Sequence, residues 1–306
     1  MTTVAVLGMG RMGSAMAGAL ARAGVDLVVQ NRTHKRAQAV AIELGCRAVR
    51  TPAEAAAEAD IAITMLADDD AVRDTFLGVD GLAAGAHAGG VLVDMSTVMP
   101  DTIRSVEAAV RATGSGLLDA PVSGSVALAS GGQLTIMVGG DQADLVAARP
   151  ALDALAKTVF HLGPLGTGAA MKLAVNTVIF GLNGAVAEGL VLAEAAGVER
   201  ALAYDVIAGG AVGAPYVIYK MAAFVDPVGT PVAFAMKLAD KDLRLIEESA
   251  ARLGVEMPQT RASHQLIEEA VARGRADDDF SAIAVELRAR RRIQSREGSQ
   301  PEEASD

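Results

Sequence analysis

The sequence predicts an α/β fold, in which a doubly wound parallel sheet is followed by an all-helical C-terminal domain. Short β-branched runs alternate with Ala-rich helical segments up to about residue 163, as in βαβ units. A glycine-rich turn follows the first of these runs, and the strand signal nearly vanishes after residue 163. At roughly 150 residues per domain, 306 residues are enough for about two such domains.

The N-terminal half supplies the elements of the predicted sheet. Its β-branched runs predict strands at Val4–Leu7, Leu27–Gln30, Ile61–Leu66, Val91–Met95, Leu117–Asp119, Leu134–Val138 and Val159–Leu162. Apolar residues at helical spacing predict helices between them at Met12–Arg22, His34–Leu44, Asp69–Phe76, Pro100–Ala112 and Asp141–Ala156. This alternation is typical of a sheet with helices on both faces.

The C-terminal half is predicted to be helical. After the link Gly163–Gly168, helical patterns run to about Arg292, with breaks at Gly209–Gly210, Gly213–Pro215 and Asp226–Thr230. Beyond that point Ser, Gly, Pro and Glu dominate, as in disordered tails. We therefore predict a sheet domain at residues 1–163, a helical domain at 164–292 and a disordered tail at 293–306.

Composition and charge exclude several classes of protein. Apolar residues make up 51% and charged residues 21%, as in globular proteins, and the net charge of −10 argues against nucleic acid or anionic lipid as a partner. The apolar stretch Ala169–Val198 predicts a buried helix and no membrane span, because four polar residues interrupt it: Lys172, Asn176, Asn183 and Glu188. The single cysteine, Cys46, and an N-terminus without a basic segment predict a cytoplasmic protein.

The first predicted strand leads directly into a G-x-G-x-x-G turn that opens a helix. In this context the first glycine allows a tight turn, the second lets the backbone approach a pyrophosphate, and the third lets helix and strand pack closely. The positive end of the helix then faces the anion. Residues 1–163 are therefore predicted to be a dinucleotide-binding domain of Rossmann type. The predicted cofactor-binding residues of the turn are Gly8, Met9, Gly10, Arg11, Met12 and Gly13.

The end of the second predicted strand bears on the choice of cofactor. Proteins that bind NAD usually place Asp or Glu here to bind the ribose 2′-hydroxyl, but this sequence has Asn31. Asn31, the guanidinium of Arg32 and the hydroxyl of Thr33 suit a 2′-phosphate instead, with Lys35 or Arg36 adding positive field. We expect NADP(H) to be preferred, with NAD(H) possible.

Lys172 lies in an otherwise apolar helical pattern, where desolvation lowers the pKa of an ammonium group. Asn176 and Asn183 fall within about 40° of Lys172 on one face of a helix with 3.6 residues per turn. A narrow polar stripe on a hydrophobic helix predicts a site for something polar.

Six motifs follow one another along the chain: Gly8–Gly13, Asn31–Thr33, Asp119–Gly124, Ile136–Gly140, Gly166–Asn176 and Lys241–Leu243. Their order is that of the β-hydroxyacid dehydrogenases, and the sequence resembles this family over roughly residues 3–290. The family includes 3-hydroxyisobutyrate dehydrogenase, tartronate semialdehyde reductase and the glyoxylate/succinic semialdehyde reductases. The resemblance implies an NAD(P)-dependent enzyme but does not choose a substrate.

The resemblance implies roles for the matching residues near the reacting groups. Lys172 matches the catalytic lysine, which gives a proton to the carbonyl oxygen during reduction and acts as a base during oxidation. Ser123 and Gly124 match the substrate-binding turn, where a hydroxyl and backbone N–H groups hold a carboxylate. Asn176 matches a residue that orients substrate or lysine.

Further matches concern the cofactor and the pocket wall. Leu66 and Thr97 match positions around the ribose and the nicotinamide, and Lys241 matches a residue that reaches the cofactor or substrate. Phe234 and Asp242 are expected near the pocket, although Asp242 is equally well read as a salt-bridge partner.

The partners implied are a small carboxylate-bearing aldehyde or hydroxyacid and further copies of the chain, in a homodimer or homotetramer. The sequence departs from the family at Ser125 and Leu128, where glycines are common. The shape of this loop, and with it the choice of substrate, therefore stays open.

Two other functions stay open. Imine reductases resemble this architecture, but they typically carry Asp or Tyr in place of Lys172 and lack the full Asp-Ala-Pro-Val-Ser-Gly run. A catalytically inert dinucleotide-binding protein would retain the fold without turnover. No metal site is predicted, because the four histidines are scattered without ligand spacing: His34, His87, His161 and His264.

Overall fold

The computed structural model describes residues 2–297, and the chain divides into two compact units, Met1–Val175 and Asn176–Asp306. All strands of the described residues lie in the first unit, and the second is helical apart from one isolated bridge between Ala235 and Asp279. This confirms the predicted fold class, a Rossmann-type α/β domain followed by a helical region. The division falls within a long helix, whereas the predicted boundary lies between residues 163 and 164.

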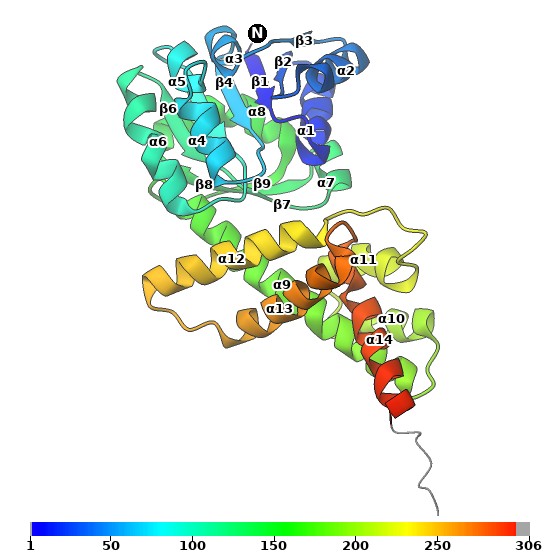
Figure 1. The fold of residues 1–306 in the computed structure, drawn as a ribbon. Helices are drawn as coiled ribbons and strands as arrows, with labels where there is room; N and C mark the ends of the chain where they lie inside the picture. The colour runs from blue at the N-terminus through cyan, green and yellow to red at the C-terminus, as the bar shows by residue number, and fades with distance from the viewer. Residues whose placement is uncertain (1, 298–306) are drawn as a thin grey trace, which may run out of the picture. The chain divides into compact units, whose positions relative to one another are not determined.

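The strands of the first unit lie side by side in one sheet (Figure 1). They are β1 (Thr3–Leu7), β2 (Asp26–Gln30), β3 (Arg47–Ala48), β4 (Ile61–Thr64), β5 (Val91–Asp94), β6 (Gly116–Asp119), β7 (Val122–Ser123), β8 (Leu134–Gly140) and β9 (Ala156–His161). The order is β3-β2-β1-β4-β5-β6-β8-β7, and β9 pairs with β8. The chain leaves β1 toward opposite sides through β2 and β4, so the topological switch point lies between β1 and β4.

Strand β8 departs from the predicted parallel arrangement. The pairs from β3 to β6 are parallel, but β8 is antiparallel to both β6 and β7. A parallel neighbour needs a crossover of about a dozen residues or more, and the short segment 124–133 between β7 and β8 does not supply one. The sequence does not predict β3 and β7, which have 2 residues each.

Helices connect the strands of the first unit. They are α1 (Arg11–Arg22), α2 (His34–Leu44), α3 (Pro52–Glu58), α4 (Asp69–Leu77), α5 (Leu82–Gly85), α6 (Pro100–Ala112), α7 (Val126–Ser130) and α8 (Gln142–Leu155). Pro52 and Pro100 open α3 and α6, where a missing backbone N–H costs no hydrogen bond. The predicted helices from His34 and from Pro100 have the observed bounds.

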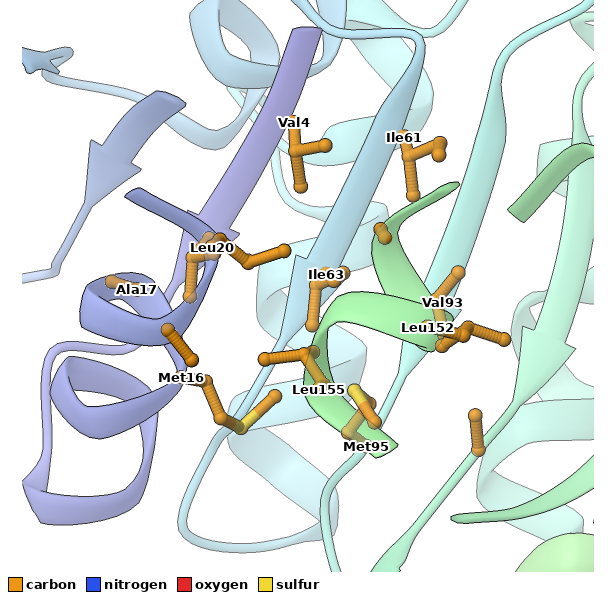
Figure 2. Close-up of a cluster of buried hydrophobic side chains, with 14 of the residues drawn as sticks. Val4, Met16, Ala17, Leu20, Ile61, Ile63, Val93, Met95, Leu152 and Leu155 are labelled. Atoms are coloured by element: carbon orange, nitrogen blue, oxygen red, sulfur yellow. The ribbon is translucent and has the colours of Figure 1, made fainter. Parts of the chain in front are cut away.

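Alternate strand residues pack against opposite helix layers. Figure 2 shows one layer, in which Val4, Ile63 and Val93 contact side chains of α1 and α8 such as Leu20 and Leu155. On the other face the intervening residues pack against α3, α4 and α6; they include Ala5, Leu7, Ala62 and Leu92. Because both faces are buried, the strands appear in the sequence as continuous apolar runs and do not alternate with polar residues.

The remaining helices begin with one that spans the division between the units. They are α9 (Thr167–Ala195), α10 (Arg200–Gly209), α11 (Pro215–Val225), α12 (Met236–Leu253), α13 (Pro258–Ala270) and α14 (Ile283–Glu297), with a π-helical turn at Val271–Arg275 and a 3-10 turn at Phe280–Ala282. The ring of Phe280 packs at 5.4 Å from that of Phe234, 5.9 Å from that of Phe180 and 5.9 Å from that of Tyr216, measured between centroids. These aromatic residues form part of the core of the second unit, together with buried aliphatic residues such as Leu243 and Ile267.

Helix α14 corrects the predicted start of the C-terminal tail. It continues to Glu297, beyond the predicted limit at residue 292. No glycine or proline interrupts the sequence from Ile293 to Glu297, so nothing in the local chemistry ends the helix there. The rest of the predicted tail, residues 298–306, lies outside the described residues.

Helix α9 is less buried than the sequence analysis expects. Among the described residues it is the one helix long and apolar enough to cross a membrane by length and composition, and 33% of its most apolar window is buried. Val178 and Leu192 are exposed. Two of the polar residues that interrupt the apolar pattern, Asn176 and Asn183, are buried. Lys172 is half-buried and Glu188 is exposed.

Candidate functional site

The predicted phosphate-binding turn lies at the switch point of the sheet. The backbone N–H of Gly8 donates to Gln30 O at 2.9 Å, and Gly8 has a φ of 100°. A Cβ at Gly8 would collide with the carbonyl oxygen of Met65 after β4, and a Cβ at Gly13 would collide with the carbonyl oxygen of Gly8. Only glycine therefore fits these two positions.

The same turn leaves the N-terminus of α1 open to an anion. Gly10 caps α1 without a side-chain hydrogen bond, the first turn contains no acidic residue, and a Cβ at Gly10 would meet nothing within 4 Å. These features suit a pyrophosphate, which binds to helix N-termini through backbone N–H groups and the helix dipole. Gly10 and Arg11 are exposed. Met9 is buried and Met12 packs against the hydrophobic core, so these two side chains anchor the turn to the domain.

Asn31 joins the turn to the end of β2. Its Oδ1 accepts a hydrogen bond from Met9 N at 3.0 Å, and its Nδ2 donates to Thr33 O at 3.1 Å. Arg32 and Thr33 are exposed, and the Thr33 side chain makes no capping bond to α2, whose first turn has no acidic residue. The residues predicted to bind a 2′-phosphate, Asn31, Arg32 and Thr33, thus lie together at the start of α2. Asn31 also binds the backbone of the glycine turn, a role that the sequence does not reveal.

The ends of β4 and β5 are joined by a buried carboxylate, which sequence analysis did not single out. Asp94 Oδ1 accepts from Thr64 Oγ1 at 2.6 Å and from Ser96 Oγ at 2.7 Å, and Ser96 Oγ accepts from Leu66 N at 2.9 Å. Burial raises the pKa of Asp94 to about 6, although both hydroxyl groups lower it. This network fixes the segment that contains Leu66. Thr97, which follows Ser96 just after β5, is partly buried.

Asp119 at the end of β6 holds the first turn of α9. Its Oδ1 accepts from Gly166 N at 2.7 Å and its Oδ2 from Ala169 N at 2.6 Å, while the side chain is 1% exposed. Burial raises the pKa of Asp119, and these backbone N–H groups oppose the shift. A Cβ at Gly139 would collide with this carboxylate. Asp119 therefore caps α9 and neutralises the positive end of its dipole.

The same strand leads into the predicted substrate-binding turn. Ser123 is the last residue of β7 and pairs with Thr135 of β8, and Gly124 follows it; both are partly buried. Ser125 then caps α7 by accepting a hydrogen bond from Leu128 N at 3.3 Å. The two departures from the family pattern thus form a short helix at this position.

The predicted polar stripe of α9 divides into members with different surroundings. Lys172 is partly buried one turn after Ala169, within the first compact unit. Asn176 Nδ2 donates to Asp242 Oδ2 at 2.9 Å in the second unit. Asn183 donates from Nδ2 to Phe280 O at 3.1 Å and accepts from Tyr216 Oη at 2.7 Å. Asn183 therefore belongs to the core of the second unit.

Lys241 and Asp242 form an ion pair in α12. Lys241 Nζ lies 2.8 Å from Asp242 Oδ1, so the buried Asp242 carboxylate binds Lys241 and Asn176 through separate oxygens. Asp242 is thus a salt-bridge partner, one of the two interpretations that the sequence left open. It fixes the orientation of the two predicted site residues that it contacts.

A second buried pair, which sequence analysis missed, holds Phe234. Lys220 Nζ lies 2.6 and 2.8 Å from the oxygens of Asp279, and Asp279 Oδ2 accepts from Phe234 N at 3.2 Å. Burial lowers the pKa of Lys220 despite the opposing Asp279 charge, and burial would raise the pKa of Asp279, but Lys220 holds it below the usual value. The signal available in the sequence was Lys220 within the apolar helical pattern 215–225. It indicates a buried ion pair, because an unpaired ammonium group is too costly to bury.

Comparison with known proteins agrees with this arrangement. Residues 3–163 match the family described as the NAD binding domain of 6-phosphogluconate dehydrogenase. Residues 166–287 match the family described as NAD-binding of NADP-dependent 3-hydroxyisobutyrate dehydrogenase. Together the two matches span nearly all of the described chain.

Individual relatives are similar over 94% or more of this chain and 80–99% of their own length. Glyoxylate/succinic semialdehyde reductase 2 of Arabidopsis thaliana is 36% identical over 287 residues, which cover 94% of this chain and 80% of that protein. A probable 3-hydroxyisobutyrate dehydrogenase of Mycobacterium bovis is 37% identical over 298 residues, with 95% and 99% covered. The structure of Mycobacterium tuberculosis 3-hydroxyisobutyrate dehydrogenase with L-serine matches with a TM-score of 0.81 and 34% identity, over 94% and 99% of the chains.

The fold and the phosphate-binding turn define a dinucleotide-binding protein, and the matched families and relatives identify it as an oxidoreductase that uses a nicotinamide cofactor. The chain belongs to the β-hydroxyacid dehydrogenase family. This confirms the resemblance that its six motifs indicate.

Proposed function

We propose that this enzyme uses NADPH to reduce a small carboxylate-bearing aldehyde or keto acid, reversibly, with Lys172 as general acid and base. The observation that carries the proposal is the capping of α9 by Asp119. Asp119 ends β6, and Ser123 ends β7 four residues later, so one carboxylate lies beside the turn suited to a substrate carboxylate and caps the helix that carries Lys172. Glyoxylate and succinic semialdehyde, named for the Arabidopsis relative, are the first substrates to test.

The chemistry follows from the side chains. A bound nicotinamide supplies or accepts the hydride at the substrate carbon. Lys172 donates a proton to the carbonyl oxygen during reduction and removes it from the hydroxyl during oxidation. The Ser123 hydroxyl and the neighbouring backbone N–H groups bind the substrate carboxylate, which fixes the carbonyl for the transfer. The Asp242 carboxylate holds Asn176 of α9 and Lys241 of α12 in fixed orientations.

The lysine is tested by Lys172→Ala with glyoxylate or succinic semialdehyde and NADPH. We expect kcat to fall by about 10²- to 10⁴-fold, the contribution of a positioned general acid. The Kd for NADPH should stay within about threefold, because Lys172 lies outside the phosphate-binding turn. Lys157→Ala, an exposed lysine in β9, is the matched control. Unchanged kcat in Lys172→Ala would remove the lysine from the mechanism.

The preference for NADPH rests on Arg32 and on the acid-free start of α2. Loss of a charge-assisted bond to a phosphate costs about 1.5–3 kcal/mol, so Arg32→Gln should lower kcat/KM for NADPH by more than about tenfold. The value for NADH should change little, because NADH has no 2′-phosphate. Arg149→Gln, which alters a half-exposed arginine of α8, is the control. Equal use of both cofactors by the unaltered enzyme contradicts the preference.

We also propose that the enzyme is a homodimer or homotetramer. Apolar side chains are exposed on α9 and α10, among them Val178, Leu192, Leu202 and Val206. Clusters of exposed aliphatic residues favour burial against another copy. Light scattering coupled to gel filtration measures the mass of the particle, and a monomer at micromolar concentration contradicts this proposal.

A further inference from the structure

A histidine and two carboxylates from two helices of the second unit meet in one cluster. His264 of α13 is 5% exposed, and its Nε2 lies 3.2 Å from Asp240 Oδ1 of α12. The same nitrogen lies 3.7 Å from Glu268 Oε1, four residues further along α13. The three potential ligand atoms all lie within 4.8 Å of one another.

The hydrogen bonds determine which form of the imidazole the cluster needs. His264 Nδ1 lies 2.9 Å from Glu247 Oε2, and an ionised carboxylate only accepts, so Nδ1 carries a proton. The Nε2 of the neutral ring then presents a lone pair toward the oxygens of Asp240 and Glu268. A lone pair facing two carboxylates is repulsive, so this position requires a cation, either a second proton or a metal ion.

The donor set and its spacing suit a metal ion. Tetrahedral bonds of 2.0–2.2 Å place ligand atoms about 3.3 Å apart, close to the observed 3.2 and 3.7 Å. One imidazole nitrogen with two carboxylate oxygens is typical of Zn²⁺ and related transition metals, whereas Mg²⁺ and Ca²⁺ prefer oxygen ligands alone. The bond from Nδ1 to Glu247 is the outer carboxylate contact that metal-binding histidines commonly make.

The charges also balance around a divalent ion. Asp240, Glu247 and Glu268 are carboxylates, and Arg244 binds the remaining oxygen of Asp240, with 2.8 Å between its Nη2 and Oδ2. With a neutral imidazole, these groups carry a net charge of about −2, assuming the ordinary ionisation states of the side chains. Arg244 leaves Oδ1 of Asp240 available to an ion.

We propose that Asp240, His264 and Glu268 bind a divalent transition-metal ion of the Zn²⁺ class, with water completing the coordination. Such an ion cross-links α12 and α13 and adds its binding free energy to the stability of the folded state. The sequence analysis did not predict the site, because it considered the spacing of the histidines alone and overlooked Glu268, four residues after His264. The third ligand, Asp240, is 24 residues from His264 in the sequence.

Zinc titration of the full-length, chelator-treated enzyme tests the proposal. We expect one equivalent of Zn²⁺ to bind per chain by calorimetry and to raise the Tm, while the same concentration of Mg²⁺ leaves the Tm unchanged. Co²⁺ should give visible d–d absorption bands of a low-symmetry site. The titration is done on Cys46→Ser, since the single thiol is a competing ligand for Zn²⁺.

Matched variants locate the ion. Glu268 is 59% exposed at its side chain, so Glu268→Gln should fold normally and weaken Zn²⁺ binding by more than about tenfold. Glu248→Gln, which alters a half-exposed carboxylate of α12 that pairs with Arg252, should bind Zn²⁺ as the parent does. Equal affinity in Glu268→Gln and the parent, or no stoichiometric Zn²⁺ binding by the parent, overturns the proposal.

Discussion

The capping of α9 by Asp119 is the most direct way to test how the fold positions Lys172. Asp119→Asn keeps the size of the side chain but replaces one acceptor oxygen with an N–H donor. Two backbone donors, Gly166 N and Ala169 N, now face one acceptor, so one of them stays buried without a partner. An unsatisfied buried donor costs about 1–3 kcal/mol.

Two effects set the size of the expected change. The first effect is the loss of the hydrogen-bond acceptor, which lowers stability. The second opposes it: a neutral amide is cheaper to bury than a carboxylate, whose desolvation raises the pKa of Asp119. We therefore expect Asp119→Asn to lower the free energy of unfolding by about 1–3 kcal/mol, and Asp119→Ala, which removes both acceptors, to lower it by about 3–5 kcal/mol. Because a shift of about 1 Å at a catalytic group costs on the order of 10²-fold, kcat should fall in both variants.

Urea denaturation and steady-state kinetics on the same preparations measure these changes. The Kd for NADPH should stay near the parent value, since the phosphate-binding turn is formed by other strands. Asp153→Asn, which removes a half-exposed partner of Arg149, should change stability by less than about 0.5 kcal/mol. The reasoning fails if Asp119→Ala unfolds within 0.5 kcal/mol of the parent, by the same order-of-magnitude criterion, and keeps its kcat.

Two further predictions concern buried charges. Asp94 has its folded pKa raised to about 6 from 3.8, so the stability that its proton confers is complete below pH ~4 and is lost as the pH rises through about 6. Asp94→Asn should therefore gain up to about 3 kcal/mol relative to the parent between pH 4 and 7 in denaturation curves, and a constant difference across this range would contradict it. Lys220→Met leaves the Asp279 carboxylate buried without its ammonium partner, so it should destabilise the protein by about 3–5 kcal/mol. Adding Asp279→Asn should recover part of that loss in a double-mutant cycle, whereas strictly additive effects would exclude the coupling.

The sequence predicted those parts of the fold whose signals are local. The strands of the Rossmann-type sheet are continuous apolar runs, and the glycine turn has its expected place between β1 and α1. Helix α3 also carries a local signal, the capping box of Thr51 with Glu54 behind Pro52, which the periodicity search passed over because α3 has only 7 residues. Strand β7 gave no such signal, since 2 residues cannot show a period.

The parts that could not be predicted depend on contacts distant in sequence. Asp119 could be matched to a motif, but its bonds to Gly166 and Ala169 join residues separated by 47 and 50 positions. The pair of Lys220 with Asp279 spans 59 positions. Helical spacing correctly placed Asn176 and Asn183 on one face, but it could not show that their partners, Asp242 and Tyr216, lie on other helices.

The side chain of Asn31 couples the glycine turn to the segment that contains Thr33, because it bonds to both. Exchange of Asn31 for aspartate, the common route toward NADH, retains an oxygen for Met9 N but removes the donor to Thr33 O. The repelled carbonyl would then displace the loop beside the adenosine ribose, together with the orientation of the pyrophosphate turn. A change of the proposed preference for NADPH therefore requires a second, compensating substitution near Thr33.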